Sequence, residues 1–180
     1  MNDHVDLLTD STLGANLEKV RLLLKDTADC DSTIYTIGNG GSQTTAEHFA
    51  ADLNLSFHRI GRKIRAHCLG SQVATNTALA NDYSYEDAFS KQLENLVKPK
   101  DLLVAFTVSG KSQNVMHAIK TALDLKIGVV AFYGFNGGEV DKVPGVTKIY
   151  TPSPLGNYGV IENIHLLMCH YLIDTLNEAN

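Results

Sequence analysis

The feature that most constrains the fold is a series of short apolar segments, each rich in β-branched or aromatic residues and each followed by a glycine or a proline. Such segments are typical of strands. Nearly continuous apolar strands that alternate with helices are typical of a parallel sheet covered on both faces. The sequence therefore predicts an α/β fold with right-handed crossover connections. The strands are expected at residues 32–37, 64–69, 102–108, 127–133 and 147–150.

Between these segments the apolar residues recur with helical spacing. The expected helices cover residues 3–28, 43–57, 71–80, 84–97, 112–126 and 158–177. A chain of 180 residues suits one core and is too short for two sizeable domains. We therefore expect a single domain over residues 1–180. The helix at 3–28 precedes the first strand and has no obvious place in the crossover pattern, so we expect it to pack against a partner subunit.

Composition excludes several classes of protein. A formal net charge of −5 argues against a general nucleic-acid binder, which needs a concentrated basic surface. No apolar run reaches the length of a membrane span, and the N-terminal residues do not have the pattern of a signal peptide. The three cysteines lack metal-ligand spacing and are expected to be free thiols, which suits a reducing cytoplasm.

Two glycine- and serine-rich segments follow predicted strands, at residues 38–42 and 107–112. Ligands of open α/β sheets bind at the carboxyl ends of the strands, where glycines let the backbone approach and helix N-termini favour anions. The alternative is that both segments are tight turns with N-cap serines. Neither matches a nucleotide-binding pattern. The pair therefore favours a small phosphorylated metabolite over a nucleotide.

Two further groups of polar residues lie on predicted helices. His48 and Asp52 are four residues apart, which places them on one helix face as a metal-binding or base-and-partner pair, or as an ordinary surface pair. Glu162, His165 and His170 lie within the apolar last helix. A lone histidine there is more often a core residue, but unpaired buried polar groups are costly, so the three together indicate a site.

Segments 38–42, 46–53, 80–83, 109–112, 134–138 and 162–165, taken in this order, resemble the motifs of the sugar isomerase (SIS) domain family, and within it the bacterial phosphoheptose isomerases. The resemblance spans almost the whole chain. It implies a three-layer α/β/α sandwich with a five-stranded parallel sheet and long first and last helices. It also implies a homotetramer with active sites at subunit interfaces.

The resemblance also implies roles for individual residues. The phosphate-binding set is Ser42, Ser109, Ser112, Thr107, Asn39, Gly40 and Gly41. Further substrate contacts fall on Asn81 and Asp82. A divalent metal, zinc, is expected on His48, Asp52, Glu162 and His170, and Asp52, His170 and Glu162 are the expected catalytic residues. Asp52 stands where the family has glutamate, and Glu162 where it has glutamine.

The function implied is an aldose–ketose isomerase that converts a phosphorylated sugar through an enediol with metal assistance. The expected substrate is sedoheptulose 7-phosphate, for the synthesis of surface-polysaccharide heptose. The expected partners are this phosphosugar and further copies of the chain, with no nucleic acid and no membrane. Two alternatives stay open: a non-catalytic SIS scaffold that binds the replication initiator protein, and an isomerase or sensor of another phosphosugar.

Overall fold

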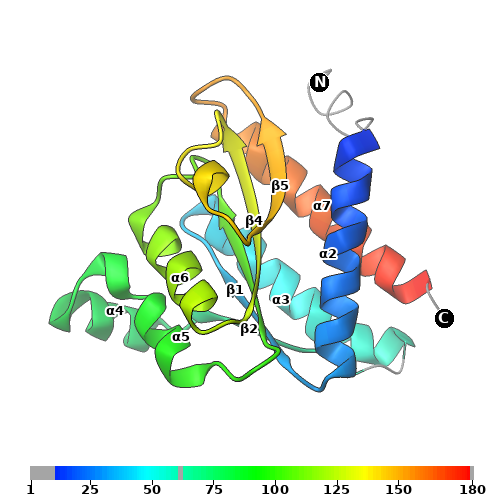
Figure 1. The fold of residues 1–180 in the computed structure, drawn as a ribbon, viewed down its shortest axis with the longest axis horizontal. Coiled ribbons are helices and arrows are strands. Elements are labelled where there is room, and N and C mark those ends of the chain that lie inside the picture. Colours follow the sequence, from blue (N-terminus) through cyan, green and yellow to red (C-terminus); the bar gives the residue numbers. More distant parts are fainter. Residues whose placement is uncertain (1–10, 61–62, 179–180) are drawn as a thin grey trace.

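The computed structural model describes residues 11–60 and 63–178. Five strands form one parallel sheet in the order β2-β1-β3-β4-β5, which confirms the predicted fold class (Figure 1). Their bounds lie close to the predicted ones: β1 Thr33–Ile37, β2 Arg65–Cys68, β3 Leu102–Thr107, β4 Gly128–Phe135 and β5 Thr147–Pro152. The carboxyl ends of all five strands therefore lie at one edge of the sheet.

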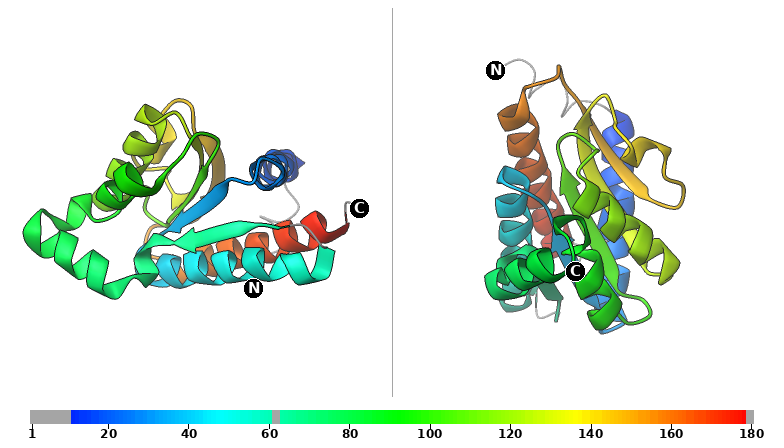
Figure 2. Two further views of the ribbon diagram at one scale, coloured as in Figure 1. Left: turned by 90° about the horizontal axis from the view of Figure 1, so that it is seen from below. Right: turned by 90° about the vertical axis from the view of Figure 1, so that its left-hand side faces the viewer.

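Helices cover both faces of the sheet (Figures 1 and 2). One face carries α2 Ser11–Asp29, α3 Gly41–Ile60 and α7 Tyr158–Glu178, and the other carries α5 Ser90–Leu96 and α6 Gln113–Asp124. Alternation along the strands explains the two cores. In β3, Val104 and Phe106 pack under the first group of helices, whereas Leu103 packs under the second.

The helix before the first strand has a place in the chain's own core. Leu17, Val20 and Leu24 of α2 are buried with residues of α3, α7 and the sheet. Residues 3–10 of the predicted helix lie outside the described part of the chain. The apolar face of α2 thus serves the core of its own subunit, and a contact with a partner subunit stays a prediction.

The predicted helix at 84–97 is divided in the structure into the 3-10 turn η2 Tyr85–Asp87 and the short helix α5. Ser84 caps η2, because its Oγ accepts a hydrogen bond from the backbone N–H of Asp87 and also contacts the Asp87 carboxylate at 3.0 Å. Local side-chain hydrogen bonds of this kind compete with a continuous helix. The apolar spacing alone does not reveal this interruption.

Helix α4, Val73–Asp82, extends away from the body of the molecule at the far side of η2 (Figure 1). None of its residues is buried, and the Val73 side chain is 71% exposed. Of the three cysteines, Cys30 is exposed, Cys68 and Cys169 are buried, and all are free thiols as predicted. Across residues 11–60 and 63–178 no helix combines the length and the apolar character that a membrane crossing needs.

Candidate active site

The two glycine-rich segments meet at the carboxyl edge of the sheet because β1 and β3 are adjacent strands. Residues 38–40 connect β1 to α3, and residues 108–112 connect β3 to α6. Between them lies a cavity of about 110 Å³. Its lining consists of Asn39, Ser42, Phe106, Thr107, Val108, Ser109, Ser112, Tyr158 and Glu162. Five residues of the predicted phosphate-binding set therefore line a single cavity.

The lining is suited to an anion. Ser42 lies in the first turn of α3, Ser112 is the N-cap of α6, and Tyr158 is the first residue of α7. Three helix N-termini therefore border the cavity, and each presents the positive end of its dipole. Serine and threonine hydroxyls add hydrogen-bond donors. Lys111 lines a neighbouring cavity with Ser109, Phe135, Asn136, Leu155, Gly156 and Tyr158, and no lysine is among the described residues that line the serine-rich cavity.

Gly41 lies directly against the carboxylate of Glu162. A Cβ atom on Gly41 would lie 2.3 Å from Glu162 Oε2 and 2.5 Å from Oε1. The carboxylate therefore rests against the first residue of α3, where the helix dipole favours a negative charge. Gly40, with φ of +55°, turns the backbone into this helix start. Both glycines of the predicted set thus shape the wall of the site.

A second group of polar side chains lies between α3 and α7, which run side by side (Figure 2). His48 Nε2 is 3.2 Å from Asp52 Oδ2 on the next turn of α3. His170 of α7 points its Nε2 at the same place, 3.2 Å from His48 Nε2 and 4.0 Å from Asp52 Oδ2. The two histidine side chains are 45% and 46% exposed, so the trio is open to a ligand from solution.

The chemistry and size of this His48–Asp52–His170 trio fit a divalent metal. One ligand atom from each residue lies within 4.8 Å of the others. Tetrahedral zinc with bonds of about 2.0–2.1 Å separates its ligand atoms by roughly 3.3 Å, close to the 3.2 Å distances observed. At this distance one imidazole N–H can donate to the other nitrogen, and a cation can replace that hydrogen bond. Three protein ligands leave a position for substrate, as catalytic zinc sites do.

Glu162 lies outside the trio, although the resemblance places it among the metal ligands. Its carboxylate is not grouped with the three ligand atoms, and the residue lies eight positions, about two helical turns, before His170 on α7. Its carboxylate lines the serine-rich cavity instead. The structure therefore divides the expected four-residue set into a metal-type trio and a carboxylate beside the anion site.

His165, the third polar residue singled out on the last helix, belongs to the core. Its side chain is 1% exposed and lies near the rings of Phe106 and Phe132, with centroids 6.3 and 5.7 Å away. Burial lowers the pKa of His165 to about 3, so the imidazole is neutral at physiological pH. His165 is therefore a core residue that belongs neither to the trio nor to the cavity lining, and the expectation that it shares a site with Glu162 and His170 is corrected.

Asn81 and Asp82 lie apart from the cavity within one chain. They end the projecting helix α4, both are exposed, and their side chains contact each other at 2.9 Å.

One buried polar residue beside the site, Asn114 on α6, was not predicted from the sequence; it is 2% exposed. The sequence does contain a sign of this residue. Asn114 directly precedes the apolar pair Val115 and Met116, where a helix face that packs on the sheet would carry apolar residues.

Fold and site together define an α/β protein with a serine-rich cavity at the carboxyl edge of a parallel sheet and a candidate metal-binding trio between two helices. The chain belongs to the SIS domain family, whose model matches residues 4–134. The match ends before α7, so Glu162 and His170 lie beyond it.

Similar proteins cover nearly the whole chain. A phosphoheptose isomerase of Colwellia psychrerythraea is 32% identical over 167 residues, which are 93% of this chain and 85% of that protein. The structure of a phosphoheptose isomerase from Neisseria gonorrhoeae superposes with a TM-score of 0.83 at 30% identity, covering 91% of this chain and 87% of that one. A phosphoheptose isomerase from Francisella tularensis gives 0.89 at 26% identity, covering 98% and 92%.

Proposed function

We propose that this protein is an aldose–ketose isomerase that interconverts sedoheptulose 7-phosphate and D-glycero-D-manno-heptose 7-phosphate. The observation that carries the proposal is the cavity lined by serine hydroxyls and the Glu162 carboxylate at the carboxyl edge of the sheet. A phosphosugar isomerase needs hydrogen-bond donors for the phosphate and a base for proton transfer, and this cavity offers both. The similarity to phosphoheptose isomerases over 93% of the chain supports the choice of substrate.

The phosphate is held by neutral groups in this proposal. Hydroxyls of Ser42, Ser109 and Ser112 donate to its oxygens, with Thr107 and Asn39 beside them. Donors fixed on helix N-termini bind an anion with little reorganisation. An acidic protein with a net charge of −5 can therefore bind an anionic substrate without a cluster of lysines.

Isomerisation moves one proton between C1 and C2. A base removes a proton from C1 of the ketose while O2 gains a proton, and the resulting enediol is then protonated at C2 as O1 loses its proton. We assign the base to Glu162, because its carboxylate lines the cavity whereas Asp52 is engaged by His48 at 3.2 Å. His170 is assigned to the metal rather than to proton transfer, because its Nε2 faces His48 Nε2 at 3.2 Å.

A divalent metal, zinc, completes the proposed site. His48, Asp52 and His170 would hold it, and when bound it supplies a positive charge that polarises the sugar carbonyl and stabilises the enediolate. Asp52 is one methylene shorter than a glutamate, and this suits its direct contact with His48 on the adjacent turn. The carboxylate of Asp52 is thus a metal ligand in this proposal rather than the base.

We further propose that the active protein is a homotetramer in the cytoplasm. Helix α4 has no buried residue, and Tyr83, just beyond its end, is 65% exposed. A second copy that packs on α4 would cover this surface and could bring Asn81 and Asp82 to the cavity of its neighbour. The three free thiols suit a reducing compartment. Multi-angle light scattering of the purified chain tests the tetramer directly.

The activity is tested with a panel of ketose phosphates, each incubated with and without zinc and followed by NMR. Sedoheptulose 7-phosphate is expected to give the aldose, with faster turnover when zinc is present. Conversion of another ketose phosphate alone would keep the reaction class and overturn the substrate. If no member of the panel is converted with or without zinc, the proposed function is wrong.

A further inference from the structure

Two asparagine side chains join the two glycine-rich segments across the floor of the site. Asn39 lies on the segment after β1, and Asn114 lies in the first turn of α6 after the second segment. The two amides form a reciprocal pair, in which each Nδ2 donates to the other Oδ1 at 2.9 Å. A pair of hydrogen bonds between segments 75 residues apart fixes the distance between the two walls of the cavity.

A backbone donor fixes the direction of this pair. The N–H of Val115 donates to Asn114 Oδ1 at 2.9 Å, and a backbone N–H can only donate. Asn114 must therefore direct its oxygen toward Val115 and its NH₂ group toward Asn39. It follows that Asn39 presents Oδ1, not Nδ2, to the NH₂ group of Asn114.

Tyr85 occupies the remaining acceptor position of Asn39. Its hydroxyl, on the 3-10 turn η2, donates to Asn39 Oδ1 at 2.7 Å. An amide oxygen accepts two hydrogen bonds, and Asn39 Oδ1 now has both. The one free hydrogen-bonding position of the Asn39 amide is the second hydrogen of Nδ2, which is a donor. Asn39 lines the serine-rich cavity and, together with Tyr85, the cavity beside it. The free N–H is the group that its amide has left for a ligand.

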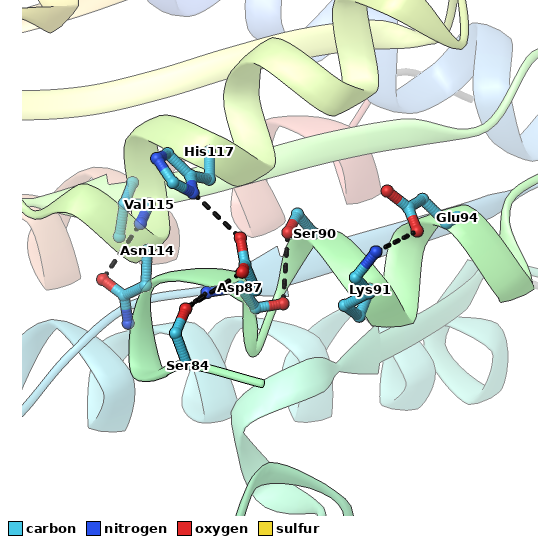
Figure 3. Close-up of polar contacts among 8 residues, drawn as sticks. All are labelled: Ser84, Asp87, Ser90, Lys91, Glu94, Asn114, Val115 and His117. Atoms are coloured by element: carbon cyan, nitrogen blue, oxygen red, sulfur yellow. Dashed lines mark hydrogen bonds and ion pairs between the residues drawn. The ribbon is translucent and has the colours of Figure 1, made fainter. Parts of the chain in front are cut away.

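The turn that carries Tyr85 is itself fastened to α6 (Figure 3). Asp87 contacts His117 Nδ1 at 3.1 Å, and His117 follows Asn114 by one helical turn. Ser84 contacts the same carboxylate at 3.0 Å, and Ser90 Oγ donates to the Asp87 carbonyl. The hydrogen bonds from His117 and Ser84 hold the pKa of the Asp87 carboxyl below its usual value, so the anchor is charged at neutral pH. These contacts place the Tyr85 hydroxyl relative to α6.

We propose that Tyr85 and Asn114 are positioning residues that lock the Asn39 amide as a hydrogen-bond donor to the substrate phosphate. Neither residue needs to touch the substrate. Asn114 opposes a 180° rotation of the Asn39 amide, which would set its carbonyl oxygen against Asn114 Oδ1 and would present a carbonyl oxygen to the anion. The hydrogen bond from Tyr85 restrains the amide in this position. The proposal rests on the proposed function in one respect only, because it takes the anion in this cavity to be the phosphate of the sugar.

The first test is Tyr85→Phe, which removes one hydroxyl and keeps the ring. Inorganic phosphate is titrated into the purified protein by calorimetry, and the kinetics are measured with sedoheptulose 7-phosphate. We expect the phosphate affinity to fall and KM to rise by roughly three- to tenfold, the usual effect of one hydrogen bond. kcat should change by less than about twofold, because the protein binds the phosphate equally tightly in the ground state and in the transition state.

Tyr35→Phe is the matched control. It removes the same atom from a tyrosine whose hydroxyl donates to the Leu96 carbonyl at 3.2 Å, away from the asparagine pair. Asn114→Asp is the second variant. It keeps an oxygen for the Val115 N–H but replaces the NH₂ group that faces Asn39 Oδ1 with a second oxygen. The pair then keeps only one of its two hydrogen bonds in either orientation of the Asn39 amide, so the orientation is no longer fixed, and the loss of phosphate affinity should be at least as large as in Tyr85→Phe.

The outcomes separate this proposal from the proposed function. The proposal of a locked donor is wrong if Tyr85→Phe binds phosphate as tightly as the wild type does, or if the wild type binds no phosphate. If the wild-type protein binds phosphate and Tyr85→Phe binds it more weakly, the proposal of a locked donor is supported, even where no sugar phosphate is isomerised. In that last case only the proposed function fails.

Discussion

Gly41→Ala tests the placement of Glu162 without removing any functional group. The added Cβ would lie 2.3 Å from Glu162 Oε2, whereas ordinary contact begins at 3.4 Å. The carboxylate must therefore move by about 1 Å, and because it is the end of a flexible side chain it can do so without disturbing the backbone. Gly41 is the first residue of α3 and is not among the residues with positive φ, so alanine is compatible with its conformation.

A displacement of this size has a large expected effect on turnover. Misplacing a catalytic group by 1 Å can cost on the order of 10²-fold in rate. We therefore expect Gly41→Ala to unfold within a few degrees of the wild type while kcat falls by about two orders of magnitude. Thermal unfolding by circular dichroism and steady-state kinetics with sedoheptulose 7-phosphate measure the two quantities.

Gly14→Ala is the matched control for this prediction. A Cβ on Gly14 would meet nothing within 4 Å, and the residue lies in the exposed part of α2. Alanine inside a helix should stabilise the protein by up to about 1 kcal/mol and leave kcat unchanged. A Gly41→Ala enzyme that keeps kcat within about threefold of the wild type would refute the position assigned to the base.

Three further predictions concern the acidic and histidine side chains. Glu162→Gln should abolish proton transfer and so lower kcat by at least about 10²-fold, while the zinc affinity stays unchanged. Asp52→Asn should instead weaken zinc binding, as measured by calorimetry. His48→Ala should remove one ligand of the trio, and an unchanged zinc affinity would contradict the site. The neutral, buried His165 has a pKa of about 3, so the unfolded chain binds one more proton between that value and about 6.5. The wild type should therefore lose about 2 kcal/mol of unfolding free energy from pH 7 to pH 5 that His165→Leu does not lose, as measured by urea denaturation.

Much of the fold could be predicted because its signals are local. β3 and β4 are runs of apolar residues that begin next to a charged residue or a glycine and end at a glycine-rich turn. The sequence of each run therefore indicates a strand by itself, without knowledge of its neighbours in the sheet. The same holds for the two glycine-rich segments, since parallel strands place their carboxyl ends at one edge. Asn39, Ser42 and Ser112 were predicted for this reason, and the structure brings them to one cavity.

The parts that could not be predicted depend on how elements pack. Helical spacing places Glu162 and His170 on roughly one face of α7, but the position of α3 along α7 decides which of them meets His48. The asparagine pair links residues 75 positions apart, and no local pattern indicates it. Asn81 and Asp82 lie on a helix without a buried residue, so their role depends on contacts beyond one chain.

The central claim is that the Glu162 carboxylate moves a proton between C1 and C2 of a heptose phosphate. The most direct test is the reaction of sedoheptulose 7-phosphate in D₂O, with the isotopic composition of the aldose read by NMR. The account predicts an aldose phosphate with the wild type, carrying deuterium at C2 to the extent that the proton on Glu162 exchanges with solvent before it is returned, and no product with Glu162→Gln. Formation of the aldose at the wild-type rate by Glu162→Gln, or no product with either protein, would contradict it.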